Sequence, residues 1–417
     1  MNNITAVILA GGKGERMGVL CQARPKPSLP FAGKYRVIDF SLSNCIYSGI
    51  NNIAVLTDYR RAHLADYIHR WRLMNARRAN LRVLEPKNES YSGTADAVYQ
   101  NLGLINKDKT DTVLILAADH VYKLDYREML AFHHRVNADV TVGVVPVPPA
   151  QAARFGTVSV SADNRISDFY EKSLASLSNL ASMGIYIFNR KILGERLTED
   201  AARPGSPHDF GYSIIPEAVK KHRVFAYVFA GYWRDIGTID TYYQTNLELV
   251  RARPRFSLDG TSPVLTREQL YEPPCIGSQA GIMNSLVSPG CVIRGRVENS
   301  VLSPRVWVDE GAVVRDSIIM GNTFIGRDSI VDGCILDEWV KVGVHSYLGL
   351  GHIPDAVDEN IIVLGQGVTV PPDTIVERKR KSIPERSPAG TVMTVVAFSG
   401  GLTPGVSTDT STVKVVS

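Results

Sequence analysis

Cysteine is scarce in this sequence, and long apolar runs are missing. The five cysteines are scattered and never form a C-x-x-C pair, so neither a disulfide framework nor a zinc site is expected, and most are interpreted as buried thiols. No run of 18 apolar residues is present, which argues against a membrane span. The N-terminus enters a strand pattern without a basic leader, so we expect a cytoplasmic protein with no membrane partner.

An excess of charge of one sign is also lacking. The 46 Lys and Arg against 42 Asp and Glu give a net charge of +4, too small to indicate nucleic-acid binding, and no nucleic-acid partner is predicted. A hydrophobic fraction of 44% and a charged fraction of 21% are typical of a globular protein. At 417 residues the chain is expected to form two domains.

Residues 1–250 alternate short apolar runs with longer amphipathic segments. This pattern predicts an α/β domain, Rossmann-like, with a mostly parallel sheet and crossover helices. In such a sheet, ligands bind at the carboxyl ends of the strands. The predicted strands are 6–10, 53–57, 113–117, 140–147 and 184–188, and the predicted helices include 38–48, 61–75, 95–105 and 126–136.

From about residue 282 to 342 the pattern changes to apolar doublets or triplets that recur every five or six residues with Gly, Asn and Asp between them, and the domain is predicted to span 282–370. This period is typical of a hexapeptide parallel β-helix, whose three short faces each turn one aliphatic side chain inward. An antiparallel β-sandwich is the alternative, but the turn signals come too often for its strands. The Pro-rich residues 251–281 are interpreted as a linker, and residues 371–417 as a C-terminal extension of unknown role.

A strand opens into a glycine-rich loop at residues 9–16, which read Leu9-Ala10-Gly11-Gly12-Lys13-Gly14-Glu15-Arg16. Glycines let backbone N–H groups approach phosphate oxygens, and the two basic side chains add charge. The loop lacks the Gly-Lys-Ser/Thr of a P-loop, and Met17 stands where a dinucleotide fingerprint has its third glycine. A structural turn is an equal alternative for such a loop taken alone.

The next basic segment is Arg24-Pro25-Lys26-Pro27, whose prolines fix where the cationic side chains project. We therefore expect several fixed cations around one phosphate chain. The motif L-A-G-G-x-G-x-R followed by R-P-K-P resembles the signature of the sugar nucleotidyltransferases. The segments Arg36-Val37-Ile38-Asp39-Phe40 and Leu42-Ser43-Asn44 are similar to the glucose-1-phosphate adenylyltransferase branch of that family.

The resemblance covers roughly residues 1–370 and implies a left-handed β-helix after the catalytic domain. It also implies that the enzyme transfers an adenylyl group from ATP to glucose 1-phosphate, with Mg²⁺, giving ADP-glucose and pyrophosphate, and works as a homotetramer. Such a reaction needs alignment and charge neutralisation rather than covalent catalysis. By resemblance, Arg16, Lys26 and Asp119 are the catalytic residues, and Leu9, Ala10, Gly11, Gly12 and Gly14 bind the nucleotide.

Asp119 follows the buried run 113–118, where a Mg²⁺ ligand would lie, although a single aspartate there is more often a turn or N-cap residue. Ala118-Asp119-His120-Val121-Tyr122 matches the family motif that carries a metal aspartate, and Asp235 matches its second metal position. Resemblance therefore implies a Mg²⁺ site on Asp119 and Asp235. His120 is given no catalytic role.

Glu171 and Lys172 follow a predicted strand, where an ammonium can bind a phosphate and a carboxylate can accept from sugar hydroxyls. Such a dipeptide is by itself usually a surface pair. It resembles the family's F-x-E-K-P, with Ser173 in place of proline. Resemblance also implies sugar contacts for Gly156, Ser182 and Tyr186, and nucleotide contacts for Tyr91, Gly93 and Thr94. The alternative for Thr94 is an N-cap of the following helix.

Two departures from the family pattern bear on specificity. The segment before Tyr91 lacks the P-A-Q-Q-R whose glutamine reads adenine, so the choice of base stays open, and Ala23 replaces a lysine of activator-sensing members. Residues 59–82 contain seven arginines and one acid. They form either a solvated basic face or a site for an anionic allosteric effector.

Three rival functions remain at this stage. A non-catalytic regulatory subunit should have replaced Asp119, Lys172 or Asp235, and all three are present. A β-helix acyltransferase would need a catalytic histidine on a coil edge, and only His345 and His352 lie near, at its end. The third rival is the same enzyme class with another nucleoside triphosphate.

Overall fold

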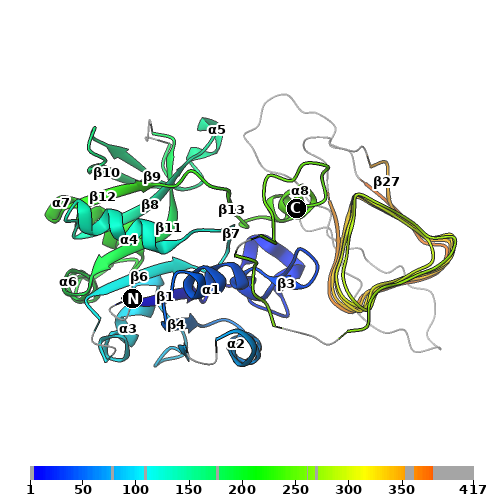
Figure 1. Cartoon of the computed structure of the whole chain (residues 1–417), viewed down its shortest axis with the longest axis horizontal. Helices are drawn as coiled ribbons and strands as arrows, with labels where there is room; N and C mark the ends of the chain where they lie inside the picture. Colours follow the sequence, from blue (N-terminus) through cyan, green and yellow to red (C-terminus); the bar gives the residue numbers. More distant parts are fainter. Residues whose placement is uncertain are drawn as a thin grey trace.

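The computed structural model describes residues 4–76, 79–107, 110–174, 178–260, 262–267, 271–352 and 361–378. Most of the predicted C-terminal extension, residues 379–417, lies outside them. The N-terminal domain is built on a nine-stranded sheet (Figure 1). Its parallel part has the order β6-β1-β4-β5, with bounds Thr112–Ala117, Ile4–Ala10, Asn52–Thr57 and Asn80–Leu84.

The other part of this sheet is mainly antiparallel, because β11 runs antiparallel to β6, β8 and β9. The bounds here are β8 Val140–Pro146, β9 Gly156–Val160, β10 Ile166–Glu171, β11 Leu180–Asn189 and β12 Val224–Val228. Parallel pairing returns only between β8 and β12. The predicted α/β class is confirmed, but the sheet is mixed, since β8 to β11 are joined by connections too short for long crossover helices.

The helices lie on both faces of the sheet (Figure 1). Along β1, Ile8 packs into the core on one face with Leu64 and Trp71, whereas Val7 packs into the core on the other face with Val98. The four predicted helices are confirmed as α1 to α4. The bounds are α1 Ile38–Tyr47, α2 Arg61–Asn75, α3 Thr94–Asn106, α4 Tyr126–Arg135, α5 Pro149–Ala152, α6 Arg190–Ala201, α7 Ile215–Lys221 and α8 Ile239–Glu248.

Short elements connect the sheet to the rest of the molecule. They are the 3₁₀ segments η1 Glu15–Cys21 and η2 Lys26–Ser28, the π-helical segment η3 Phe210–Ile214, and the strands β2 Pro30–Phe31, β3 Tyr35–Arg36, β7 His120–Tyr122 and β13 Trp233–Asp235. β7 pairs antiparallel with β13 outside the main sheet. This small pair brings two distant parts of the chain together at one end of the domain.

The second domain is a three-sided parallel β-helix, seen along its axis as a triangle in Figure 1. Val292, Trp307 and Phe324 stand in register on successive coils. The predicted β-helix is confirmed, and all pairings within the three sheets are parallel, which excludes the β-sandwich. The first sheet contains β14 Cys275–Ile276, β17 Val292–Ile293, β20 Trp307–Val308, β23 Phe324–Ile325, β26 Lys341–Val342 and β29 Thr369–Val370.

The other two sheets repeat the same stacking, with aliphatic residues such as Val314 and Leu336 in a shared interior. The second contains β15 Gly281–Met283, β18 Arg296–Glu298, β21 Val313–Arg315, β24 Ile330–Asp332, β27 Tyr347–Leu350 and β30 Ile375–Glu377. The third contains β16 Leu286–Val287, β19 Val301–Leu302, β22 Ile318–Ile319, β25 Cys334–Leu336 and β28 Ile362–Leu364.

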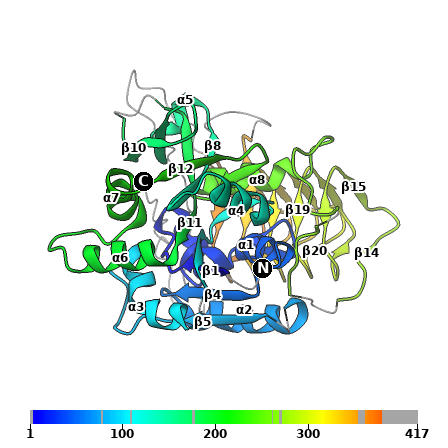
Figure 2. The ribbon, with the colours of Figure 1, turned by 60° about the vertical axis from the view of Figure 1, so that its left-hand side comes forward.

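The two domains are packed against one another. Helix α8 contacts β22, and Figures 1 and 2 show it on the side of the N-terminal domain that faces the β-helix. Met17 and Tyr242 share one apolar cluster with Met320 and Ile335. Of the five cysteines four are buried, whereas Cys275 is exposed. Within the described residues, no helix has the length and apolar character needed to cross a membrane.

Candidate active site

Two carboxylates and one ammonium group meet at the end of the parallel strands. Asp119 follows β6, and the register of β13 with β7 places Asp235 opposite His120. The Lys26 Nζ atom lies 2.7 Å from Asp119 Oδ2 and 3.7 Å from Asp235 Oδ1. Three segments that are distant in sequence therefore place their charged side chains together.

The charges in this group support one another. Burial alone would lower the pKa of the Lys26 ammonium, but Asp119 and Asp235 outweigh burial and raise that pKa. Burial alone would raise the pKa of the Asp119 carboxyl, but Lys26 and His120 outweigh it and hold the pKa well below its usual range. The ammonium and the carboxylate are therefore both ionised at neutral pH.

Arg16 reaches the same place from η1. A Cβ atom at Gly237 would lie 2.5 Å from Asp235 Oδ2 and 3.3 Å from Arg16 Nη2, so the guanidinium and the carboxylate both lie against this glycine. Arg16, Lys26, Asp119 and Asp235 thus converge, as predicted for a site that binds phosphate groups. Arg16 is itself exposed, which leaves its charge accessible to a ligand.

Arg24 does not join them, and the prediction that it would was wrong. Its side chain is buried, with Nη1 2.7 Å from Asp337 Oδ1 and Nη2 3.0 Å from Glu338 Oε2 in the β-helix domain. Pro25 is extended and Lys26 begins the 3₁₀ segment η2, so the backbone conformation changes between the two cations. The Lys26 side chain contacts Asp119 of the N-terminal domain, whereas the Arg24 side chain contacts the β-helix.

The residues at this site fit a divalent metal. Asp119, His120 and Asp235 each offer one ligand atom, and these atoms lie within 4.8 Å of one another. Carboxylate oxygens are the protein ligands that Mg²⁺ prefers. His120 Nε2 lies 3.3 Å from Asp119 Oδ1, and its Nδ1 is buried without a hydrogen-bond partner. No catalytic role was predicted for His120, although its position directly after Asp119 was the available signal for a place in this group.

The glycines of the loop have different tasks. Gly14 has a φ of +70°, and a Cβ there would lie 2.9 Å from Cys21 Sγ and 3.1 Å from Lys26 Cβ, so its need for glycine is structural. Gly12 is exposed and has no atom within 4 Å of its missing Cβ. The backbone at Gly12 is therefore the part of the loop open to a ligand.

Leu9, Ala10 and Gly11 connect this loop to its neighbours. The Leu9 carbonyl accepts a hydrogen bond of 3.3 Å from Ala118 N–H, which places the end of β1 beside Asp119. A Cβ at Gly11 would lie 3.0 Å from Asp58 Cβ, and Asp58 Oδ2 accepts from Tyr91 N–H at 3.3 Å. Asp58 was missed by the sequence reasoning. It follows β4, so its position at the carboxyl end of a central strand was the available signal.

The predicted sugar residues form a second group. Glu171 ends β10, and a Cβ at Gly156 would lie 2.5 Å from Glu171 Oε2, so this glycine makes room for the carboxylate. Lys172 Nζ lies 3.1 Å from Glu171 Oε1 and 5.7 Å from the centre of the Tyr212 ring. Burial raises the pKa of the Glu171 carboxyl, and Lys172 opposes that rise.

Strand β11 connects the second group to the first. Ser182 Oγ donates to Tyr186 Oη at 3.3 Å, and both residues are buried. Gly184 lies between them with a φ of +65°, and a Cβ there would lie 3.3 Å from His120 Cε1. Ser182 and Tyr186 therefore flank the glycine that packs against His120, next to Asp119. Glu171 and Lys172 form a separate ion pair.

Thr94 does not cap α3, so that alternative is wrong. The helix begins at Thr94 itself, its N-cap is Gly93, and no side chain caps it. The Thr94 hydroxyl instead donates to Asp209 Oδ2 at 2.8 Å and accepts from Phe210 N–H at 3.0 Å. A Cβ at Gly93 would overlap the carbonyl oxygen of His208, so this glycine permits close packing of that segment.

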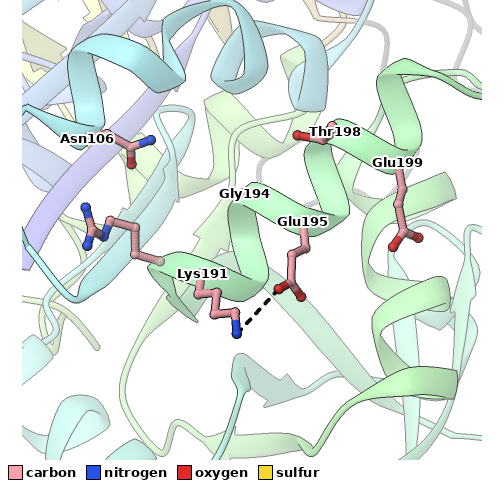
Figure 3. Close-up of a pocket in the computed structure, with 7 residues that line it drawn as sticks. Asn106, Lys191, Gly194, Glu195, Thr198 and Glu199 are labelled. Carbon is pink, nitrogen blue, oxygen red and sulfur yellow. Dashed lines mark ion pairs between the residues drawn. The ribbon is translucent and has the colours of Figure 1, made fainter.

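Two surface features lie apart from these groups. A groove of about 630 Å³ between α3 and α6 contains none of the predicted site residues, and its Lys191–Glu195 pair is 4.0 Å apart (Figure 3). In the arginine-rich stretch, Arg70 and Arg61 pair with Asp66 and Glu85 at 3.1 and 3.6 Å. Arg77 and Arg78 of that stretch lie outside the described residues.

Comparison with known proteins agrees with the two-domain fold. Residues 5–251 match the family model described as nucleotidyl transferase, and residues 276–371 match the model described as GlmU-like, C-terminal hexapeptide. Fold and site together thus define a nucleotidyltransferase with a hexapeptide-repeat β-helix. Enzymes of this class generally use a divalent metal.

Three relatives share most of their length with this chain, and each is named glucose-1-phosphate adenylyltransferase. The one from Acetivibrio thermocellus is 42% identical, covering 88% of this chain and 90% of the relative. The one from Thermomicrobium roseum is 41% identical, covering 91% and 92%, and the one from Clostridium perfringens is 43% identical, covering 77% and 85%. The chain belongs to the glucose-1-phosphate adenylyltransferase family.

Proposed function

We propose that this protein transfers the adenylyl group of ATP to glucose 1-phosphate, giving ADP-glucose and pyrophosphate for glycogen synthesis. The proposal rests on membership of this family together with one structural observation. The Lys26 ammonium lies between the Asp119 and Asp235 carboxylates at the end of the parallel strands, where Arg16 joins them.

The reaction asks for charge and alignment. A phosphate oxygen of the sugar phosphate attacks the α-phosphorus of the nucleotide, and pyrophosphate leaves. Lys26 and Arg16 supply fixed positive charge toward the phosphate oxygens, in a setting where Lys26 stays ionised despite its burial. Mg²⁺ held by Asp119 and Asp235 supplies further positive charge when bound.

The exposed backbone at Gly12 binds the triphosphate, with Leu9, Ala10, Gly11 and Gly14 shaping the loop. Tyr91, Gly93 and Thr94 line the nucleotide pocket next to Asp58, which lies against Gly11 and accepts a hydrogen bond from Tyr91 N–H. Tyr91 is tied to α3 by a 3.0 Å hydrogen bond from Asn101 Nδ2, which fixes the position of its ring.

On the sugar side, Lys172 binds the phosphate of glucose 1-phosphate, and Glu171 accepts from sugar hydroxyls. The hydroxyls of Ser182 and Tyr186 and the backbone at Gly156 complete that side. The Tyr186 ring stacks on Phe210 with centroids 5.7 Å apart, so its hydroxyl has a fixed position. A rigid sugar subsite aligns the attacking oxygen with the α-phosphorus.

The test is pyrophosphate release by the purified protein with Mg²⁺, with four nucleoside triphosphates crossed against several sugar 1-phosphates. ATP with glucose 1-phosphate should give the highest kcat/KM. A different best nucleotide would overturn the choice of ATP, and a different best sugar would overturn the choice of glucose 1-phosphate. Absence of turnover with every pair would overturn the enzymatic proposal and favour a regulatory subunit.

We also propose that the chain forms a homotetramer and that the arginine-rich stretch 59–82 binds an anionic effector. Light scattering gives the subunit number directly. For the effector, phosphorylated metabolites are added to the assay at rising salt. Activation or inhibition that weakens with salt supports the site, and a salt-independent response to every metabolite removes it.

A further inference from the structure

A second cluster of metal-ligand types lies in the β-helix, outside the catalytic site. Asp316, Asp332 and His352 each offer one ligand atom, and these atoms lie within 4.8 Å of one another. His352 Nε2 is 3.2 Å from Asp316 Oδ2 and 3.8 Å from Asp332 Oδ1. The His352 and Asp332 side chains are only 6% and 4% exposed.

The coil geometry explains why these residues meet. Asp332 stands in register with Arg315 on the coil before it, and Asp316 directly follows Arg315 with a φ of +44°. His352 comes just after β27, the next strand of the same sheet. Three successive coils thus each contribute one ligand to the same corner of the β-helix.

The corner is also shaped to hold the imidazole. Gly333 has a φ of +60°, and a Cβ there would overlap Arg378 Nη2 and lie 2.7 Å from His352 Nδ1, so this glycine makes room for both side chains. A side chain at position 333 would therefore push the ring away from the two carboxylates. The absence of a side chain at Gly333 thus allows His352 Nε2 to lie close to the two aspartates.

The hydrogen bonds leave one ligand atom unsatisfied. A single N–H at His352 Nε2 can donate well to one oxygen, and Asp316 Oδ2 is the nearer. Arg315 donates to Asp332 Oδ2 at 2.6 Å. Asp332 Oδ1 is left buried without a hydrogen-bond partner, although it faces the imidazole. An unpaired buried carboxylate oxygen is costly, and a cation at this point would satisfy it.

We propose that Asp316, Asp332 and His352 form a binding site for a divalent transition metal, distinct from the Mg²⁺ site of the catalytic domain. One imidazole nitrogen with two carboxylate oxygens suits Zn²⁺ bound by three protein ligands and water. Arg315 pairs with Asp332, and the Arg378 guanidinium lies in the same corner against Gly333. The two arginines balance the two carboxylates, so a single divalent ion leaves the corner with a net charge of about +2.

The site lies at the contact between the domains. The Tyr243 hydroxyl, from α8, donates to the backbone carbonyl of Asp316. Helix α8 itself begins shortly after Asp235. An ion that holds Asp316 to its neighbouring coils therefore also holds the carbonyl group that Tyr243 of α8 contacts. Its expected effect is on stability, since none of its ligands belongs to the catalytic groups.

Zinc uptake by the full chain tests the proposal. The metal-free protein is dialysed against Zn²⁺, and bound zinc is measured for the parent and for His352→Gln. His345→Gln is the matched control, because His345 also lies between two aspartates, at 3.7 and 3.6 Å, but on an exposed surface. We expect His352→Gln to lose about one zinc ion per chain relative to the parent, and His345→Gln to lose none.

A thermal measurement provides the second readout. Zinc should raise the Tm of the parent and of His345→Gln, but not that of His352→Gln, because an ion that binds only the folded state stabilises it. Asp316→Asn, at the more exposed edge of the corner, replaces His352→Gln if that variant does not fold. Equal zinc uptake by the parent and the variants, or an unchanged parent Tm, would overturn the proposal.

Discussion

Lys26 is buried, yet it must present a positive charge to a substrate. Moving an ammonium out of water is expensive unless opposite charges surround it. Asp119 and Asp235 provide that compensation in the protein without ligand, at 2.7 and 3.7 Å. The same two carboxylates are the proposed metal ligands, so the lysine and the metal share them. This sharing keeps the site assembled before any ligand binds.

The role of Asp119 can be separated from its contribution to stability. Asp119→Asn should lower kcat by about 10²- to 10³-fold, because the amide removes negative charge needed for the metal. It should cost about 1–3 kcal/mol of stability, because Lys26 loses one of its two compensating charges but keeps Asp235, and the amide oxygen can still accept from the ammonium. Activity by pyrophosphate release and unfolding by urea check both parts.

The control for this variant is Asp66→Asn, which removes a charge from an exposed ion pair with Arg70. The kcat of this control should stay that of the parent. Its free energy of unfolding should change by no more than a surface ion pair contributes, about 0–1 kcal/mol. An Asp119→Asn protein that keeps full activity while losing several kcal/mol of stability would make the aspartate structural and remove it from the catalytic group.

Gly12 tests whether the glycine loop binds the nucleotide. Its missing Cβ faces open space, so Gly12→Ala should leave the fold intact. If the triphosphate approaches the backbone here, the added methyl group should raise the KM for ATP about tenfold, a loss of about 1.4 kcal/mol. Gly103→Ala, in the exposed middle of α3, is the control and should leave that KM unchanged. Equal KM values for both variants would place the triphosphate elsewhere.

Among the elements, those that could be predicted depend on local pattern. The apolar periods of β1, β6 and α2 follow from neighbouring residues, and the loop and Asp119 follow from strand ends. The direction of Arg24 could not be predicted, because its acidic partners are more than 300 residues away. The contact of Thr94 with Asp209 likewise depends on the position of η3, which no local signal reveals.

Arg24 joins η2 to the β-helix, and its removal tests that connection. Arg24→Met would leave the Asp337 carboxylate buried without its cation, at a cost of about 3–5 kcal/mol. The double variant Arg24→Met with Asp337→Asn should recover part of that loss, because the charge that was left unpaired is gone. Urea unfolding of both proteins measures the difference.

Arg327→Met is the matched control, since Arg327 forms an ion pair with Glu310 on the exposed surface of the β-helix domain. Its effect on stability should stay within about 1 kcal/mol. If Arg24→Met were as mild as this control, the buried ion pair would contribute little to the contact between the domains.

At the scale of the whole molecule, the two domains share apolar surface. The cluster around Met17, Leu20 and Tyr242 in the catalytic domain continues into Met320 and Ile335 of the β-helix. All five side chains are fully buried. Separating the domains would expose this surface to water, in addition to breaking the Arg24 pair, so neither domain is expected to unfold independently.

We therefore expect a single thermal transition for the full chain in scanning calorimetry. Met320→Ala should lower the free energy of unfolding by about 2–5 kcal/mol through the cavity it leaves at the shared cluster. It should also begin to separate the transition into two, because it weakens the contact between the domains. Val314→Ala, inside the β-helix, is the control and should lower the Tm without separating the transition. Two transitions in the parent protein would show that the shared cluster does not couple the domains.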